Sequence, residues 1–261
     1  MDLLQAIILG IIQGVTEWLP ISSTGHLRIA ETYFSLTVPL LFDVMLHVGT
    51  LVVTLVFFRR DIKEILKALV KRNFTTETGK LIPLIIIGTV PTALIGFFFG
   101  AALDTYFSTF LALGLGFVAC GFALYVSKYG KETNDDLTYI DALLIGAAQG
   151  IAIIPSISRS GLTIAAALLL GIRREKAFKF SFLLSIPSII GALGLTLYEQ
   201  NVELAFAGVG FLEIVVGVGF SIVVSFLALK FLWRSLATCR FYLFAIYCFV
   251  IGATLVGLSF M

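Results

Sequence analysis

The sequence has 261 residues, of which 59 % are hydrophobic and 13 % are charged, and its formal net charge is +2. Apolar runs of about 20 residues recur along it, which excludes a soluble globular domain and indicates a polytopic membrane protein. We expect one integral membrane domain, surrounded by the lipid bilayer and without a nucleic-acid partner. The three cysteines stand singly in apolar runs, a spacing that suits neither a zinc site nor a disulfide framework.

Two pairs of apolar stretches are too short to cross a membrane. The first pair covers residues 3–19 and 27–36, and the second covers residues 140–154 and 162–172. A bilayer core of about 30 Å needs roughly 20 helical residues, so each stretch reaches only part of the way across. We therefore predict two re-entrant helical hairpins, whose turns must be buried in protein or face a water-filled cavity.

Six other runs are long enough to be transmembrane helices. They lie at about 40–58, 80–102, 107–127, 176–198, 208–230 and 240–260. The predicted fold is all-α, and each half of the chain consists of one hairpin followed by three transmembrane helices. Repeat 1 covers about residues 1–127, and repeat 2 covers about residues 137–261.

The basic residues agree with this count of crossings. All but two of the 18 Lys and Arg residues fall in four clusters, at 59–80, 128–131, 173–179 and 230–240. Six spans and two hairpins put all four clusters on one side of the membrane, which the positive-inside rule makes cytoplasmic. Because each half then crosses the membrane an odd number of times, we predict an inverted-topology repeat. Such repeats commonly hold a polar site near the membrane midplane.

Residues 10–25 and 146–161 are two copies of one motif at a constant offset of 136. Each copy contains a short apolar stretch, a proline, a hydroxyl-rich turn and a second apolar stretch. These turns hold most of the polar groups that a reaction could use, so we predict that they form the site. The residues that are identical at this offset are Gly10 and Gly146, Gln13 and Gln149, Gly14 and Gly150, Ile21 and Ile157, Ser22 and Ser158, and Gly25 and Gly161.

Glu17 is the first candidate for chemistry, because it stands within the first short apolar stretch. An ionised carboxylate in the membrane is costly without partners, which makes it a functional candidate by default. The alternative is an acid exposed in an outer vestibule. Gln13 precedes it by four residues and shares its helical face. His47 follows Asp43 by one turn, and a structural hydrogen bond between them is at least as plausible as a supporting role at the site.

His26 follows three hydroxyl residues, Ser22, Ser23 and Thr24, at the first turn. This cluster offers a proton donor or acceptor together with several candidate nucleophiles. Ser23 is the first candidate nucleophile, ahead of Thr24 and Ser22. The residues alone do not choose among the three hydroxyls and the imidazole, and a purely structural histidine is the alternative.

Arg159 stands between Ser158 and Ser160 at the tip of the second hairpin. An arginine at such depth needs an anion, and its planar five-donor fork suits phosphate oxygens. Both turns precede a half-helix, whose free N–H groups also favour anions. Gly161 permits close approach of an oxyanion. The alternative is a structural ion pair between Arg159 and Glu17.

Together these motifs resemble the undecaprenyl-diphosphate phosphatase family, also called bacitracin-resistance proteins, over essentially the whole chain. The family's acidic motif begins with Glu or Gln, and this sequence has Gln there. The residues that carry the resemblance are Gln13 and Glu17, the run Leu19-Pro20-Ile21-Ser22-Ser23-Thr24-Gly25-His26, the run Pro155-Ser156-Ile157-Ser158-Arg159-Ser160-Gly161, and the segment 180–187. Ser156 stands where the family often has Gly.

The resemblance implies a cell-membrane enzyme that removes the terminal phosphate of undecaprenyl diphosphate and so recycles the lipid carrier for peptidoglycan and other cell-envelope glycans. It also implies dependence on magnesium or calcium and a site that faces the outer side. A transporter or flippase for a polyprenyl phosphate is the alternative function, because inverted repeats with broken helices are also transporter architecture. The sequence leaves a homodimer open.

The residues and the resemblance together suggest a division of labour. We expect Arg159 to bind the diphosphate, Glu17 to hold the divalent cation or position a proton, and Ser23 and His26 to take part in the chemistry. The side chains and backbone expected to contact the substrate are those of Gln13, Ser22, Thr24, Gly25, Ser158, Ser160 and Gly161.

Overall fold

The computed structural model describes residues 1–107, 109–199 and 209–260. Regular structure in these ranges is helical, without a β-strand, which confirms the predicted all-α polytopic fold. The long helices match the six predicted spans. Position 108 and the start of the fifth predicted span, at 208, lie outside the described residues. The long helices are α3 (Leu40–Phe57), α5 (Leu81–Tyr106), α6 (Phe110–Val126), α9 (Arg174–Glu199), α11 (Phe211–Ala237) and α12 (Phe244–Leu258).

Four shorter helices form the two predicted hairpins. They are α1 (Leu3–Thr16), α2 (Ser23–Tyr33), α7 (Tyr139–Ile151) and α8 (Arg159–Leu169). At a rise of about 1.5 Å per residue each reaches only about 16–21 Å, which is less than the thickness of a bilayer core. The second arms begin at positions 23 and 159, earlier than the predicted 27 and 162, because Ser22 and Ser158 act as N-caps.

The helix starts of the two hairpins correspond in position, although the turns between the arms differ, since φ is 68° at Ser22 and -73° at Ser158. The first arms begin with capping boxes, made by Asp2 in α1 and by Thr138 in α7, and these caps are 136 positions apart. The second arms, α2 and α8, have 11 residues each and start at the same offset. The paired motif is therefore a structural repeat at the hairpins, while the inversion of the two halves in the membrane stays a prediction.

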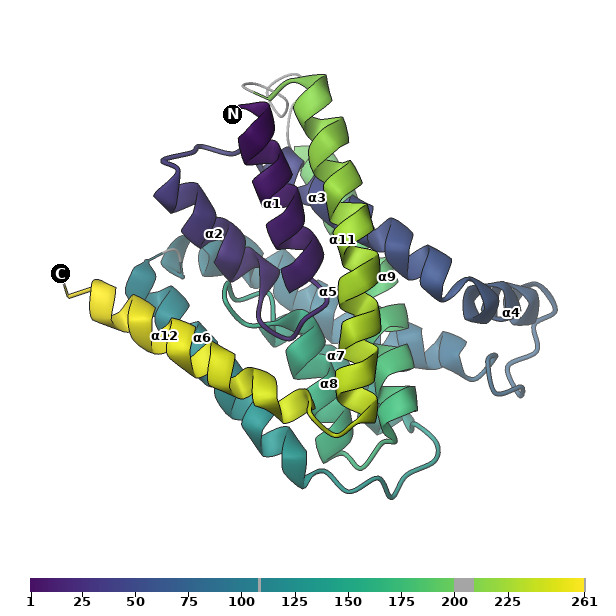
Figure 1. Ribbon diagram of the computed structural model, residues 1–261. Helices are drawn as coiled ribbons and strands as arrows, with labels where there is room; N and C mark the ends of the chain where they lie inside the picture. Colours follow the sequence, from purple (N-terminus) through teal and green to yellow (C-terminus); the bar gives the residue numbers. More distant parts are fainter. Residues whose placement is uncertain (108, 200–208, 261) are drawn as a thin grey trace.

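The helices pack reciprocally, as Figure 1 shows: α1 lies along α11, α7 lies along α5, and α6 lies along α12. Each hairpin thus packs on a long helix of the other half. Small residues allow these contacts. A Cβ on Gly10 would collide with the carbonyl of Gly217, and one on Gly146 would collide with that of Gly88. Close backbone approach of this kind drives helix association where lipid removes the hydrophobic contribution.

Aromatic side chains pack around the turn of the first hairpin. Trp18 is 1 % exposed, and its ring centroid lies 5.0 Å from that of Phe182 in α9. Phe182 in turn contacts the rings of Phe58 and Phe178. The polar groups of the turn are therefore held on a packed apolar base.

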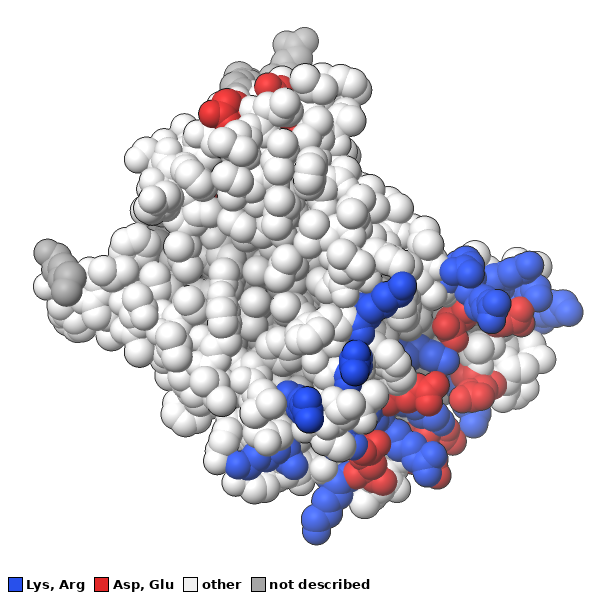
Figure 2. Space-filling model, in the orientation of Figure 1, with Lys and Arg blue, Asp and Glu red and all other residues white. Residues whose placement is uncertain are grey.

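One amphipathic helix, α4 (Arg59–Val70), bends away from α3 by 79°. Most of the charged residues visible in Figure 2 gather on the side of the molecule where α4 projects, and a wide uncharged area adjoins them. The charge distribution is that of a membrane protein whose polar surface lies at its ends.

Candidate active site

The turn of the first hairpin is built around Ser22, which has a left-handed φ of 68°. Its hydroxyl accepts a hydrogen bond from the N–H of Gly25 at 3.3 Å and so caps α2. In the second hairpin the hydroxyl of Ser158 accepts from the N–H of Gly161 at 3.1 Å. As a result, Ser23 and Arg159 occupy the same position, the first residue of the second arm, in the two copies.

Both of these residues contact Glu17, which is only 8 % exposed. The hydroxyl of Ser23 donates to Oε2 of Glu17 at 2.7 Å, and Nη2 of Arg159 donates to Oε1. Gln13 donates to Oε2 from Nε2 at 3.3 Å. The buried carboxylate is therefore satisfied by a hydroxyl, an amide and a guanidinium that come from both hairpins.

The two turns also contact each other directly. The Ser160 hydroxyl lies 3.3 Å from the carbonyl oxygen of Trp18 and 3.5 Å from that of Glu17. A Cβ on Gly161 would lie 3.1 Å from Cβ of Pro20. Since Cβ of Ser158 would lie 3.0 Å away as well, position 161 is crowded from both hairpins, and this close approach brings Arg159 to the carboxylate.

Arg159 keeps one donor free for a further acceptor. Its side chain is 19 % exposed, and Nη1 is buried without a hydrogen-bond partner among the described residues. The guanidinium carbon lies 6.0 Å from the ring centroid of Phe182, whose face adds a cation–π contact. A guanidinium with one nitrogen on Glu17 and another available can bind a phosphate oxygen without leaving the carboxylate.

His26 makes its contacts elsewhere. Nδ1 lies 2.7 Å from the carbonyl oxygen of Ser22, and Nε2 lies 2.6 Å from the hydroxyl of Tyr247 in α12. The carbonyl only accepts, so Nδ1 carries a proton, and when the ring is neutral Nε2 accepts from the tyrosine. The ring of Phe117 meets the imidazole edge-on at 5.3 Å. Within the described ranges, no hydrogen bond joins His26 to Glu17 or Arg159.

The remaining predicted residues have mainly structural contacts. Ser22 and Ser158 are caps, and Ser158 also lies 3.3 Å from the hydroxyl of Ser160. Thr24 is exposed and lies 3.3 Å from the hydroxyl of Ser22. A Cβ on Gly25 would lie 2.6 Å from the ring of Phe117. Their backbone groups shape the two turns, and of the hydroxyls in this group only that of Thr24 is exposed.

Two further residues belong to the site: His47, for which the sequence left a supporting role open, and Tyr247, which the sequence did not indicate. Nε2 of His47, in α3, lies 3.5 Å from Oε2 of Glu17. Its Nδ1 lies 2.8 Å from the backbone carbonyl of Asp43, so the bond expected between these two residues is made by the main chain. Tyr247 is 221 positions from His26, and no local pattern links them.

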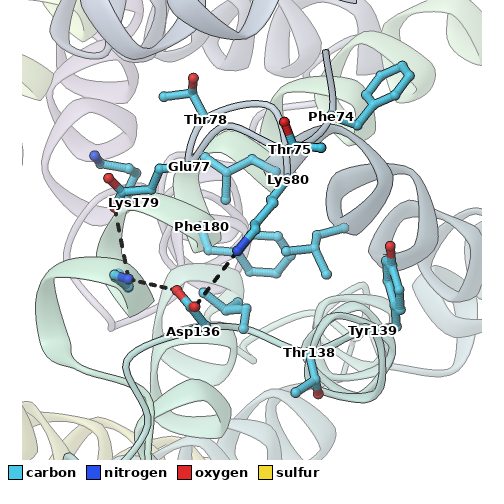
Figure 3. Close-up of a pocket in the computed structure, with 14 residues that line it drawn as sticks. Phe74, Thr75, Glu77, Thr78, Lys80, Asp136, Thr138, Tyr139, Lys179 and Phe180 are labelled. Carbon is cyan, nitrogen blue, oxygen red and sulfur yellow. Dashed lines mark hydrogen bonds and ion pairs between the residues drawn. The ribbon is translucent and has the colours of Figure 1, made fainter. Parts of the chain in front are cut away.

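A cavity of about 810 Å³ lies apart from the hairpin turns and shares no lining residue with them (Figure 3). Lys176 donates to Asp136 at 3.2 Å, and Lys80 lies 4.0 Å from the same carboxylate. The hydrogen bond from Lys176 lowers the pKa of the Asp136 carboxyl. These ion pairs join the segment before α5, the segment before α7 and the start of α9, which is a structural role.

Comparison with known proteins identifies the relatives of this chain. The family model described as bacitracin resistance protein BacA matches residues 6–254. The chain belongs to the BacA family. An undecaprenyl-diphosphatase of Carboxydothermus hydrogenoformans is 42 % identical to it over 266 residues, covering 99 % of this chain and 98 % of the relative. An undecaprenyl-diphosphatase of Korarchaeum cryptofilum is 38 % identical, covering 99 % of this chain and all of the relative. Undecaprenyl-diphosphatase 3 of Bacillus cereus is 45 % identical over 197 residues, covering 74 % and 73 % of the two chains.

A divalent cation in this BacA-family chain would have few protein ligands. Among the described residues, no three His, Cys, Asp or Glu side chains are grouped as a metal site. Glu17 offers a carboxylate, and Oε1 of Gln13 is a buried amide oxygen without a hydrogen-bond partner in the same ranges. One carboxylate and one amide oxygen fit Mg²⁺, which commonly takes its other ligands from water and substrate phosphates.

Proposed function

We propose that this BacA-family protein is an undecaprenyl-diphosphate phosphatase. It hydrolyses the anhydride bond of undecaprenyl diphosphate to give undecaprenyl phosphate and inorganic phosphate, and so returns the lipid carrier to cell-wall glycan synthesis. The observation that carries the proposal is the contact of Glu17 with both Ser23 and Arg159. The full-length relatives named undecaprenyl-diphosphatase support the same substrate.

Binding begins at the guanidinium. Nη1 of Arg159 takes an oxygen of the terminal phosphate, and the N–H groups at the starts of α2 and α8 add favourable dipole ends. The charge on the transferred phosphoryl group is offset by the same donors as the bond breaks. The polyprenyl tail lies along apolar grooves between helices, so only the headgroup enters the polar site.

Ser23 is the nucleophile that the geometry supports best. Its hydroxyl already donates to Glu17 at 2.7 Å, so the carboxylate can accept the proton as Oγ attacks the terminal phosphorus. The bond to the bridging oxygen breaks, and undecaprenyl phosphate leaves with that oxygen. Water then attacks the phosphoserine and releases inorganic phosphate, while Glu17 returns its proton to Oγ of Ser23. His26 lies one turn after Ser23 on α2 and takes the proton of this water once Nε2 exchanges its hydrogen bond with Tyr247 for one with the water.

The divalent cation, Mg²⁺ or Ca²⁺, is part of the proposal. Glu17 and the amide oxygen of Gln13 would hold it, and when bound it would neutralise charge on the phosphate oxygens. Ser23 and Arg159 keep their roles in attack and in binding of the headgroup.

Orientation and assembly complete the proposal. The four basic clusters face the cytoplasm. The site opens toward the outer face, from which the diphosphate headgroup would enter it. A homodimer is a further expectation, which light scattering of the detergent-solubilised protein tests.

The experiment is phosphate release from undecaprenyl diphosphate by purified protein in detergent micelles, where no second compartment exists. Stoichiometric release of inorganic phosphate and undecaprenyl phosphate is expected. No release, together with transbilayer movement of undecaprenyl phosphate in reconstituted vesicles, would favour the transporter function instead.

A further inference from the structure

The bend between α3 and α4, here called the elbow, holds a second candidate binding site apart from the hairpin turns. A groove of about 490 Å³ runs along this elbow. Four of its lining residues are basic and the other four are aliphatic. The basic ones are Arg59, Lys63, Lys67 and Lys71, and the aliphatic ones are Leu55, Ile62, Leu66 and Val70.

The two kinds of side chain form parallel stripes on α4 and its C-terminal end. The basic residues recur every fourth position from 59 to 71, and the aliphatic residues recur every fourth position from 62 to 70. Residues four apart on a helix are neighbours on one face, so a continuous row of cations runs beside a continuous row of apolar side chains. Leu66 is 55 % exposed and Val70 is 84 % exposed, which leaves the apolar row open to a ligand.

Most of the cations in the groove are available to an anion. Lys67 donates to Glu64 at 2.7 Å, and Arg59 donates to the carbonyl of Val56 at 3.1 Å. Within the described ranges, Arg59, Lys63 and Lys71 make no ion pair with a carboxylate. The remaining acid of α4, Asp61, pairs with Lys179 at 2.9 Å. The groove is therefore positively charged on one side and apolar on the other.

The bend between α3 and α4 places the basic and apolar stripes at the depths of a lipid's headgroup and acyl chains. Because α4 turns 79° away from α3, it lies close to the membrane plane if α3 crosses the membrane. The basic stripe is then at the level of the headgroups, and the apolar stripe is at the level of the acyl chains. Figure 2 shows basic side chains gathered on the part of the molecule where α4 projects.

We infer that the elbow groove is a binding site for one anionic phospholipid of the leaflet that α4 contacts. The phosphate-bearing headgroup pairs with Arg59, Lys63 and Lys71, and an acyl chain covers Leu66 and Val70. The lipid is held as a bound ligand, and an anionic headgroup is preferred over a zwitterionic one. This inference stands independently of the phosphatase mechanism, because no residue of the groove belongs to the hairpins.

The test places a fluorescent reporter in the groove. A Leu66→Trp variant is reconstituted in phosphatidylcholine nanodiscs that contain a small fraction of either dibrominated phosphatidylglycerol or dibrominated phosphatidylcholine. The emission of the two native tryptophans is subtracted with the unsubstituted protein. Stronger quenching by the brominated phosphatidylglycerol is expected. Equal quenching by the two lipids would overturn the inference.

Charge removal sharpens the test. Adding Arg59→Gln, Lys63→Gln and Lys71→Gln should weaken the preference by about two orders of magnitude, because each cation near an anionic surface contributes about fivefold. The matched control removes one arginine and two lysines outside the groove, with Arg240→Gln, Lys131→Gln and Lys230→Gln, and should keep the preference. Equal loss in both triple variants would show a diffuse charge effect and contradict a defined site.

A salt titration of Leu66→Trp alone does not depend on the folding of the triple variants. Raising the ionic strength should reduce quenching by the anionic lipid toward that by phosphatidylcholine, since salt screens the exposed cations. A preference for phosphatidylglycerol that is insensitive to salt would contradict the role of the basic stripe.

Discussion

The hydroxyl of Ser23 lies 2.7 Å from Oε2 of Glu17, across the turn that joins α1 to α2. The other carboxylate oxygen faces Arg159 of the second hairpin. Glu17, the proposed base, thus contacts both the candidate nucleophile and the anion-binding group. The predictions below separate their roles.

Removal of the Ser23 hydroxyl should abolish covalent attack. Ser23→Ala should lower kcat for phosphate release by about 10³-fold or more, because both the nucleophile and its base are then without function. The control is Thr32→Ala on the same helix, which removes an exposed hydroxyl that donates to the backbone of Arg28 at 2.8 Å. A phosphoserine trapped at position 23 by rapid acid quench would support the step, and full activity of Ser23→Ala would contradict it.

Arg159 should contribute to both catalysis and stability. Arg159→Ala should reduce kcat/KM by about 10³-fold, as for other arginines that clamp a transferred phosphoryl group. It also leaves the Glu17 carboxylate buried without its guanidinium partner, which should lower the free energy of unfolding by about 3–5 kcal/mol. Arg159→Lys keeps the charge but loses the fork, so it should recover more stability than activity. Equal recovery of both would mean that Arg159 acts only as the structural partner of Glu17.

Tyr247 should fix the orientation and tautomer of His26. Tyr247→Phe removes the donor to Nε2 and should reduce kcat by about tenfold, the equivalent of one hydrogen bond. Tyr242→Phe, in the 3₁₀ turn (Phe241–Leu243) before α12, is the matched control. Nitrogen-15 NMR of the histidine rings, assigned with His47→Gln, should show the Nδ1-protonated tautomer of His26. The Nε2-protonated tautomer would refute this arrangement.

Gln13 should influence the use of a metal. If its amide oxygen and Glu17 hold the cation, Gln13→Ala should weaken the apparent affinity for Mg²⁺ by about tenfold, and Gln13→Glu should strengthen it. Mn²⁺ binding followed by electron paramagnetic resonance gives a readout independent of turnover. Identical binding curves for all three proteins would show that position 13 does not coordinate the metal.

The contact of α7 with α5 should tolerate no added methyl group. Gly146→Ala places a Cβ against the carbonyl of Gly88 and should destabilise the protein by about 1–3 kcal/mol. Gly191→Ala and Gly194→Ala, where a Cβ meets nothing within 4 Å, should instead be neutral or stabilising by up to about 1 kcal/mol. Thermal unfolding in one detergent measures all three. Equal effects at the three positions would mean that the close helix crossing is not required.

Much of the fold follows from local sequence. Apolar run length predicts the six long helices, and the offset of 136 predicts that Ser22 and Ser158 have equivalent positions, because capping and helix length depend on neighbouring residues. The ion pair of Glu17 with Arg159 is the structural alternative that the sequence offers to phosphate binding.

The contacts that escaped prediction depend on packing between distant segments. His47 reaches Glu17 only because α3 packs beside the first hairpin, and Tyr247 reaches His26 from the other end of the chain. The second arms begin earlier than hydrophobicity predicts, because hydrophobicity does not detect a cap made by a serine. His26 is consequently one turn inside a helix, where its ring faces α6 and α12.

Ser23 and Arg159 are each the first residue of the second arm in the two copies of one motif. A molecule with two identical halves would present either a pair of hydroxyls or a pair of guanidiniums there, and neither pair combines attack on phosphorus with neutralisation of its charge. Divergence between the two copies, which also sets Glu17 opposite Ile153, therefore turns a symmetric scaffold into one with a chemically directional centre. The duplication supplies the frame, and the difference between its copies supplies the reactivity.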